Sequence, residues 1–320
     1  RAGAVDLGCW EVLRPARGSA ELAAAGQKSR EAMRGLLRNV DLAVMLPGAS
    51  PDDAEYAAMQ DLLNEGHGRT IHFHWRGGGA PSAVEIPGHP LPADSEIDAF
   101  YQKALLGTDY AALGESQRRF EAALRGGEVR VTTPAGTDLR FRIGDRPVNR
   151  QDGDASAARA AAGRILIDRE IELPAGVIRV APLEESVEGT IAFPPADWGG
   201  PDGGGKAEGL KLRFFHGKVV EVSAAQGKEA VESELAQGGD AARSFREFAL
   251  GLNPALAIPD ERPWIPYYGY GAGVVRLSLG DNSELGGKVK GDYVRWNFFP
   301  DATVTVGGEV WVRDGKLVRR

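Results

Sequence analysis

Hydrophobic positions recur along the first 125 residues with two alternating spacings. Apolar residues every three or four positions predict amphipathic helices, whereas a short apolar run between turn residues predicts a buried strand. Helical spacing covers residues 19–37, 51–64 and 97–125, the last broken near Gly107 and Gly114, and strand-like runs cover 41–46 and 69–75. The alternation indicates a small α/β layer over residues 1–125.

From Glu128 onward the pattern changes to short alternating segments separated by turn residues. Period-two alternation predicts strands with one buried face. The expected strands cover residues 129–133, 138–143, 177–180, 190–193, 210–215, 218–222, 274–279 and 303–313. Other expected features are hairpin turns at Gly217-Lys218 and Asp314-Gly315, a helical interval over 228–251 and a mobile loop over 199–205. These features predict a β-rich domain over residues 126–320.

The charge balance excludes several classes of partner. The 320-residue chain has 38 lysines and arginines against 45 acidic residues, a formal net charge of −7. Nucleic-acid-binding proteins usually concentrate basic residues, so this balance argues against a nucleic-acid partner. No apolar window is long enough to span a bilayer, so we expect no membrane partner. The single Cys9 excludes an intramolecular disulfide and suits a reducing cytoplasm, where we expect the protein to act.

The two histidines of the 69–75 strand, His72 and His74, lie on one face of that strand, with His67 nearby in sequence. Such spacing can place two imidazoles on one metal ion. No acidic residue stands beside the pair to orient either ring. We therefore favour a structural or solvent-facing pair over a metal or catalytic site, and both interpretations remain open.

Five segments of the second half carry a more specific signal. In chain order they cover residues 131–139, 170–190, 246–254, 275–282 and 294–297, and the second contains Leu-Pro-Ala-Gly and then Pro-Leu-Glu-Glu-Ser. Together they resemble the motifs of the thermophile-type metallo-aminopeptidases, the aminopeptidase T and S family. The dihydroxypyridine dioxygenases resemble the same scaffold and use iron on it. The resemblance spans about residues 126–316.

The resemblance implies a fold and an assembly. It implies an α/β protein in which a Rossmann-like amino-terminal layer, residues 1–125, precedes a β-rich α+β domain, residues 126–320, that carries the family's metal site. It also implies a homodimer whose clefts face the interior.

The family's metal site is only partly retained. Its members hold two metal ions through two glutamates, two histidines, a tyrosine and an aspartate, and Glu184 and Glu247 match the two glutamates. Arg276 stands at one histidine position, and Arg295 and Asn297 replace the other histidine and the aspartate. No tyrosine lies near residue 283. Four of six ligands are therefore missing, and because the dioxygenases' iron site needs the same histidines and aspartate, we expect no metal and no other cofactor.

Arginine changes the chemistry available at these positions. Its guanidinium stays protonated near neutral pH, has no lone pair for a metal, and forms strong ion pairs with carboxylates. In one interpretation the arginines and glutamates form an internal salt-bridge plug on a scaffold that lost its activity. In the other, Arg276 and Arg295 bind a substrate anion, Asn297 positions it, and Glu184 or Glu247 acts as an acid or base.

Aromatic residues precede the Arg276 segment. Tyr268 and Tyr270 lie in a segment rich in proline and glycine, where they either stack on a ligand or pack beneath a loop. We expect a metal-independent relative of the aminopeptidases that binds a peptide or an amino-acid-derived carboxylate in a specialised biosynthetic pathway. Whether it also transforms that ligand is left open. The alternatives are a non-catalytic scaffold protein and a metallo-aminopeptidase that recruits other ligands such as His72 or His74. Whether the protein is an enzyme is open at this point.

Overall fold

The computed structural model describes residues 30–45, 53–73, 82–200 and 204–318. The chain divides into two compact units, one of residues 1–72 with 154–171 and the other of residues 73–153 with 172–320. Residues 94–126, which precede the predicted domain boundary, belong to the larger of these two units. The domain boundary at residue 125 stays a prediction. Each unit is described by itself.

The smaller unit contains a three-stranded sheet in the order β1-β2-β7, in which β1 and β2 are parallel. Its elements are β1 (Ala43–Met45), α2 (Ala54–Asn64), β2 (Thr70–His72), α5 (Ala157–Ala162), η1 (Leu166–Asp168) and β7 (Glu170–Glu172), and residues 30–37 are helical. Buried Met59, Leu62 and Leu63 of α2 form its apolar core with Leu37. This strand-helix-strand arrangement with parallel strands agrees with the α/β alternation predicted for this part of the chain, while the predicted bounds of the layer, residues 1–125, stay a prediction.

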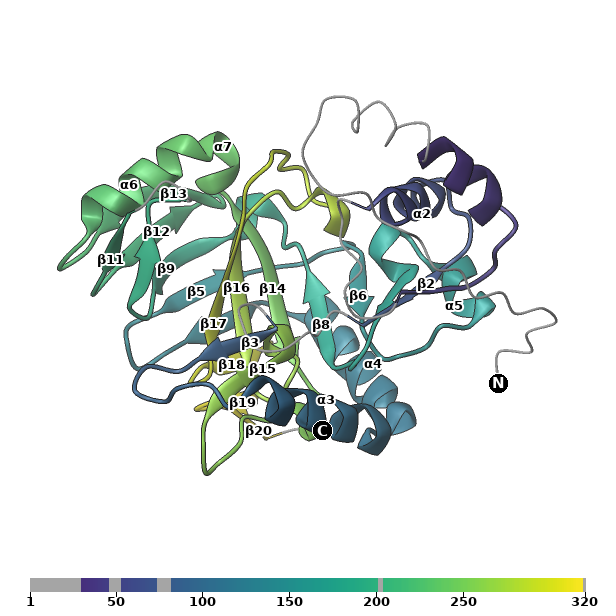
Figure 1. The fold of residues 1–320 in the computed structure, drawn as a ribbon. Helices are drawn as coiled ribbons and strands as arrows, with labels where there is room; N and C mark the ends of the chain where they lie inside the picture. The colour runs from purple at the N-terminus through teal and green to yellow at the C-terminus, as the bar shows by residue number, and fades with distance from the viewer. Residues whose placement is uncertain (1–29, 46–52, 74–81, 201–203, 319–320) are drawn as a thin grey trace. The chain divides into compact units, whose positions relative to one another are not determined.

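The larger unit contains two main antiparallel sheets, and Figure 1 labels all of their strands except β4. The five-stranded sheet has the order β17-β16-β14-β8-β6, formed by Val294–Phe299, Val275–Gly280, Phe245–Gly251, Val177–Val180 and Val148–Arg150. The eight-stranded sheet has the order β13-β12-β9-β5-β4-β18-β19-β20, formed by Lys218–Ser223, Lys211–Phe215, Glu188–Ala192, Asp138–Phe141, Val129–Thr132, Thr303–Val306, Glu309–Arg313 and Lys316–Leu317. Apolar residues of both sheets join one hydrophobic core.

Helices and short ribbons cover the larger unit. The remaining elements are β3 (Ala83–Glu85), α3 (Asp94–Gly107), α4 (Tyr110–Gly126), η2 (Glu184–Ser186), β10 (Ala196–Trp198), β11 (Gly205–Ala207), α6 (Lys228–Gln237), α7 (Gly239–Ala242), η3 (Pro254–Leu256), β15 (Trp264–Pro266), η4 (Tyr267–Gly269) and η5 (Ser283–Leu285). An aromatic cluster packs α3 against β15 and η4 through Tyr101, Trp264 and Tyr267. No helix in the described part of the chain combines the length and apolar character that a bilayer crossing needs.

Two sequence-based expectations about helices are corrected. The interval 228–251 is helical only to Ala242, because its last seven residues form the strand β14. That strand is paired on both sides and every residue of it is buried, so it lacks the alternation that identifies a half-exposed strand. The helix α4 also continues through Gly114, which is buried within it, while Gly107 ends α3 as expected.

The structure contains both predicted hairpin turns but divides one predicted strand in two. The hairpin at Gly217-Lys218 connects β12 to β13, and the Asp314-Gly315 turn connects β19 to β20. The predicted strand over 303–313 is two strands, separated by Gly307 and Gly308 in positive-φ conformations. Part of the 199–205 loop, residues 201–203, lies outside the described residues.

Candidate functional site

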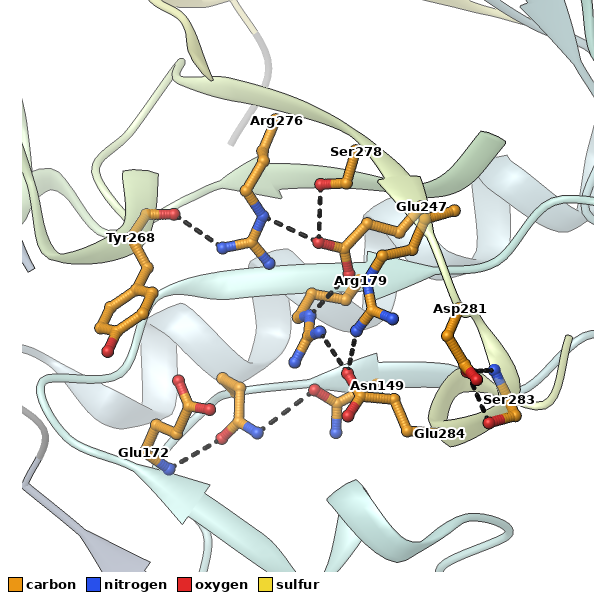
Figure 2. Close-up of polar contacts among 12 residues, drawn as sticks. Asn149, Glu172, Arg179, Glu247, Tyr268, Arg276, Ser278, Asp281, Ser283 and Glu284 are labelled. Atoms are coloured by element: carbon orange, nitrogen blue, oxygen red, sulfur yellow. Dashed lines mark hydrogen bonds and ion pairs between the residues drawn. The ribbon is translucent and has the colours of Figure 1, made fainter. Parts of the chain in front are cut away.

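The five-stranded sheet arranges its polar residues by strand parity. In an antiparallel pair, opposite residues share a face and successive residues alternate between faces. Arg179 of β8 and Arg276 of β16 lie opposite Ala249 of β14, and Glu247 lies opposite Ser278. These four polar residues therefore share one face of the sheet, and Figure 2 shows their side chains converging there. We call Arg179, Arg246, Glu247, Arg276 and Glu284 the arginine cluster.

Glu247 lies at the centre of this cluster and is fully buried. Its Oε2 accepts a hydrogen bond from Nε of Arg179 at 2.9 Å, and its Oε1 accepts one from Nε of Arg276 at 2.9 Å and one from Oγ of Ser278 at 3.1 Å. Burial alone would raise the pKa of Glu247, but the charges of Arg179, Arg276 and Arg246 outweigh it and hold the pKa well below its usual range. Glu247 is therefore an ionised carboxylate with occupied oxygens.

Arg246 joins the same cluster because β14 carries a bulge. The register between β14 and β16 shifts between Phe245 and Glu247, which leaves Arg246 as the extra residue. A bulge re-aims side chains locally, and here Nη2 of Arg246 donates to Oε1 of Glu284. Nη2 of Arg179 donates to the same oxygen at 2.9 Å. Two guanidinium groups thus converge on a single carboxylate oxygen.

The three guanidinium groups keep unused donors. Each guanidinium has more N–H groups than the one or two used here. Nη2 of Arg276 and Nη1 of Arg179 have no hydrogen-bond partner among the described residues, and Nε of Arg246 is buried without one. Because a buried unpartnered donor costs free energy, this face of the sheet favours an additional acceptor.

Aromatic residues border the cluster next to Arg276. Its Nη1 donates to the backbone carbonyl of Tyr268 at 2.9 Å, and its guanidinium carbon lies 5.8 Å from the ring centroid of Trp296. The rings of Tyr268 and Trp296 meet edge to face at 5.7 Å between centroids. Tyr267 and Tyr268 both have positive φ, which is a strained conformation for tyrosine. Trp296 remains 36% exposed, so the aromatic border reaches solvent.

The tyrosine hydroxyls are poor proton donors to a base. Burial raises the pKa of Tyr268 to about 12, and the charge of Glu172 adds to that effect. Tyr270 is buried and donates its hydroxyl to Oε2 of Glu172. Burial, again with the Glu172 charge, raises the pKa of Tyr270 well above its usual value. Tyr270 thus packs in the aromatic core, whereas Tyr268 contacts the cluster through its backbone carbonyl.

Glu184, the other retained glutamate, does not contact Glu247 among the interactions of the described residues. Its Oε2 pairs with Nη2 of Arg146, and its Oε1 accepts from Nδ2 of Asn282 at 3.1 Å and from the backbone nitrogen of Lys288 at 2.7 Å. Burial would raise the pKa of Glu184, but these hydrogen bonds and the Arg146 charge lower it. Glu184 therefore fixes the segment that carries Asn282 and Lys288.

Arg295 and Asn297 lie on the opposite face of the sheet. They are opposite Leu279 and Leu277, whose neighbour Ser278 faces the arginine cluster. Nη1 of Arg295 binds Oε1 of Glu234 at 3.0 Å, and its guanidinium carbon lies 3.6 Å from the ring centroid of Trp198. The structure therefore does not bring these two residues together with Arg276.

The Asn297 side chain is committed to the backbone. Its Nδ2 donates to the carbonyl oxygen of Leu277 at 3.1 Å. In addition, its Oδ1 accepts from Nε of Arg295 at 3.3 Å. Asn297 thus supports the orientation of Arg295 rather than presenting a free amide.

The histidines of the smaller unit make local contacts. His72 is buried, and its Nε2 lies 2.6 Å from Oγ1 of Thr70. His74 lies outside the described residues. His67 bonds the backbone carbonyl of Arg38 through its Nε2. Nε2 of His72 also lies 3.9 Å from Oε1 of Glu170, so an acidic residue that is distant in sequence stands beside this ring, and the role of His72 stays a prediction.

The retained residues do not fit the two-metal site of the aminopeptidases. Both oxygens of Glu247 are occupied by arginine donors, and a guanidinium cannot replace an imidazole as a ligand. No group of three or more histidine, cysteine, aspartate or glutamate side chains in the described ranges is arranged to hold a metal ion. The positive charge that a metal would supply next to Glu247 is supplied here by guanidinium groups.

Comparisons with known proteins show what this chain is similar to. Residues 112–258 match the thermophilic metalloprotease (M29) family. Wild-type AmpT from Thermus thermophilus has a similar structure, with a TM-score of 0.54 and 18% identity over 93% of this chain and 80% of that chain. The 2,5-dihydroxypyridine dioxygenase from Pseudomonas putida KT2440 gives a TM-score of 0.52 and 17% identity over 92% of this chain and 98% of that chain. No curated protein gives a significant match.

These matches confirm the family resemblance predicted from the motifs. The chain has an aminopeptidase-like α/β scaffold, and the segment that matches the M29 family includes Glu184 and Glu247, the two residues predicted to match the family's glutamates. At these identities the two solved structures establish the shared fold.

Sequence reasoning missed Arg179, Arg246 and Glu284. Arg179 is a charged residue inside the otherwise apolar strand Val177–Val180, all four residues of which are buried. Because an arginine buried in an apolar strand needs a partner, that position is a usable signal. The bulge that redirects Arg246 and the turn that places Glu284 depend on pairing between distant segments, which spacing does not show.

Proposed function

We propose that this protein is a metal-independent relative of the metallo-aminopeptidases that binds the carboxylate of a peptide or an amino-acid-derived ligand. The observation that carries the proposal is the convergence of Arg179, Arg246 and Arg276 on one sheet face with N–H donors left over. Arginine donors in a largely dehydrated setting suit carboxylates because the planar fork matches both oxygens.

Each residue has a distinct part in this proposal. Arg179, Arg246 and Arg276 supply the donors for the ligand carboxylate. Glu247 holds Arg179 and Arg276 in place through their Nε atoms, which leaves their outer nitrogens turned to other acceptors. The exposed edge of Trp296 contacts the apolar part of the ligand.

Binding is favoured over acid-base catalysis. A general base works best with a pKa near the working pH, whereas the pKa values of Glu247 and Glu184 are both lowered. Both carboxylates also have their oxygens engaged by hydrogen bonds. We therefore assign Glu184 and Glu247 organising roles in the proposed site.

A second candidate is a non-catalytic scaffold in which the arginine cluster is only an internal plug. The small exposure of Arg179, Arg246 and Arg276, at 6%, 3% and 3%, favours it. Charged groups this buried often serve structural specificity instead of ligand binding. The homodimer and the cytoplasmic location implied earlier stay predictions under either candidate.

Calorimetric titration with N-acetylated amino acids and with the corresponding amides separates the two candidates. The proposed site binds the acids and rejects the amides by about tenfold or more, since an amide loses the charge-assisted hydrogen bonds. The Arg179→Lys variant keeps the charge but loses the planar fork, and we expect it to weaken acid binding about tenfold. Equal, negligible binding of acids and amides to the unaltered protein would favour the internal plug.

A further inference from the structure

The carboxylate of Glu284 differs from the rest of the arginine cluster in exposure. Its side chain is 38% exposed, whereas the side chains of its partners Arg179 and Arg246 are 7% and 4% exposed. Both hydrogen bonds from the arginines end on Oε1, and Oε2 has no hydrogen-bond partner among the described residues. Glu284 therefore covers two buried guanidinium groups from the solvent side and uses one of its two oxygens.

The turn that carries Glu284 is held by contacts that do not involve its carboxylate. Oδ2 of Asp281 accepts from the backbone nitrogen of Gly291 at 2.7 Å. Oδ1 of Asn282 accepts from the backbone nitrogen of Val289 at 2.8 Å, and the backbone nitrogen of Asn282 donates back to Val289 at 3.1 Å. Since the turn is closed from both ends, the Glu284 side chain can swing away from the arginines without unfolding the turn.

Gly287 shows how tightly this turn is built. A Cβ atom at Gly287 would lie 2.0 Å from Oδ1 of Asn282. Gly286 has a φ of +76°, in the region that favours glycine. The backbone of the turn is thus tightly packed, so only the side chain of Glu284 has to move if the contact is to open.

We infer that Glu284 is an internal substitute for the ligand carboxylate, and that a ligand binds by displacing it from Arg179 and Arg246. This inference rests on the proposed function. It adds where the ligand carboxylate binds and which side chain the ligand has to displace. The entering group carries one negative charge, like the group it replaces, and its two oxygens satisfy both guanidinium groups where Glu284 uses one. The ligand class is therefore a monocarboxylate, such as an α-carboxylate at the end of a peptide.

Two consequences follow from this competition. Removing the Glu284 carboxylate leaves Arg179 and Arg246 without this anion, so a small free carboxylate restores what the variant loses. A neutral side chain at residue 284 no longer competes as an anion, so the affinity for a ligand carboxylate rises. A merely structural salt bridge does not predict the second effect, so the gain in ligand affinity separates the two accounts.

The first experiment is rescue of Glu284→Ala by sodium formate, measured as melting temperature against sodium chloride at equal ionic strength. We expect formate to raise the melting temperature of Glu284→Ala by several degrees more than chloride does. The matched control is Glu221→Ala, which breaks an exposed ion pair with Arg213 of 2.8 Å and gains nothing specific from formate. If Glu284→Ala folds poorly, its refolding yield in formate against chloride gives the same comparison. Equal effects of formate and chloride on the variant would overturn the inference.

The second experiment measures the affinity of N-acetylated amino acids for the unaltered protein and for Glu284→Gln. We expect the variant to bind at least about tenfold more tightly, a change that calorimetry resolves. Binding that is unchanged or weaker in Glu284→Gln, while the unaltered protein still prefers acids to amides, overturns this inference and leaves the proposed function intact. If formate rescues Glu284→Ala but the N-acetylated acids do not bind, a carboxylate site at Arg179 and Arg246 is supported and the proposed ligand class is rejected. Absence of both rescue and binding rejects the two together.

Discussion

The two faces of the five-stranded sheet each carry an arginine that the motif resemblance predicts to stand at a histidine position, and the two arginines have different surroundings. Arg276 shares its face with Arg179, Arg246 and Glu247, and its Nη2 has no partner among the described residues. On the other face, Arg295 is enclosed by Glu234, by the carbonyl oxygen of Asp197 at 2.9 Å and by the ring of Trp198.

The acidic partners differ in the same way. Glu234 accepts hydrogen bonds from Tyr293 and Arg295 at Oε1 and from the backbone nitrogen of Gly199 at Oε2, so one arginine meets one carboxylate supported by neutral donors. Glu247 faces three arginines instead. The comparison teaches that an arginine can be enclosed by its neighbours on one face of the sheet and keep unused N–H donors on the other. The position of each arginine along its strand decides on which face it lies.

Among the variants that test the difference between the two faces, we expect the largest loss of stability at Glu247. Replacing it in Glu247→Ala leaves three buried guanidinium groups without their central carboxylate, and we expect a loss of about 3–5 kcal/mol in the free energy of unfolding. Ser278→Ala, which removes one neutral donor to Glu247, should cost about 1 kcal/mol. Urea denaturation of both variants measures the difference. A loss below about 1 kcal/mol for Glu247→Ala would contradict a central role for this carboxylate.

Acid pH tests both faces together. Burial would raise the pKa of Glu234, but the hydrogen bond from Tyr293 and the charge of Arg295 outweigh it and lower the pKa. Burial would also raise the pKa of Glu247, but the charges of its arginines lower it. A depressed folded-state pKa stabilises the protein above the ordinary value of 4.5 and loses that stabilisation as the pH falls through the folded-state value. We expect stability that changes little from pH 8 to about 5 and declines below that, less steeply in Glu234→Gln. Stability that increases on acidification would refute these assignments.

A smaller effect separates the two arginines by ligand affinity. Arg276→Met should weaken the binding of N-acetylated amino acids about tenfold, or about 1.4 kcal/mol, whereas Arg295→Met should leave it within about twofold. The reason is that only Arg276 lies on the face with unused donors. Calorimetric titration of the two variants side by side makes the test. Equal losses in both would mean that the faces are not separate.

The smallest effect is expected at Tyr293. Its hydroxyl donates to Oε1 of Glu234 at 2.6 Å, and Tyr293→Phe removes this bond while Arg295 and Gly199 still support the carboxylate. We expect a loss of about 1 kcal/mol, measured by urea denaturation, with no change in ligand affinity. A change in ligand affinity as large as that of Arg276→Met would show that the two faces are coupled.

Much of the fold could be predicted from the sequence where one face of an element is exposed. The strands β12 and β13 both have exposed positions, and they match their expected ranges to within a residue at either end. The strand β14 was not predicted, because it is buried on both faces, has no alternation to detect and directly follows a helix in the chain. The equally buried strand Val177–Val180 was predicted with its observed bounds, since it is a short apolar segment that follows turn residues. Propensity and periodicity describe a segment, whereas burial on both faces comes from its neighbours.

The candidate site was predictable in its residue types and only partly in its membership. The motifs identified Glu247 and Arg276, which the structure joins at 2.9 Å. Grouping Arg295 and Asn297 with them required the register between β16 and β17, since a shift of one residue moves a side chain to the other face. Spacing along one strand does not contain that register.

The most direct test of the central claim, that guanidinium groups have replaced the metal site next to Glu247, is the metal content of the protein. Elemental mass spectrometry is applied to protein purified without chelators or affinity-tag histidines, and again after dialysis against zinc, cobalt, manganese or iron. We predict no stoichiometric metal under any of these conditions, because Arg179 and Arg276 occupy both oxygens of Glu247. About two retained equivalents of metal per chain, together with aminopeptidase turnover, would contradict the account.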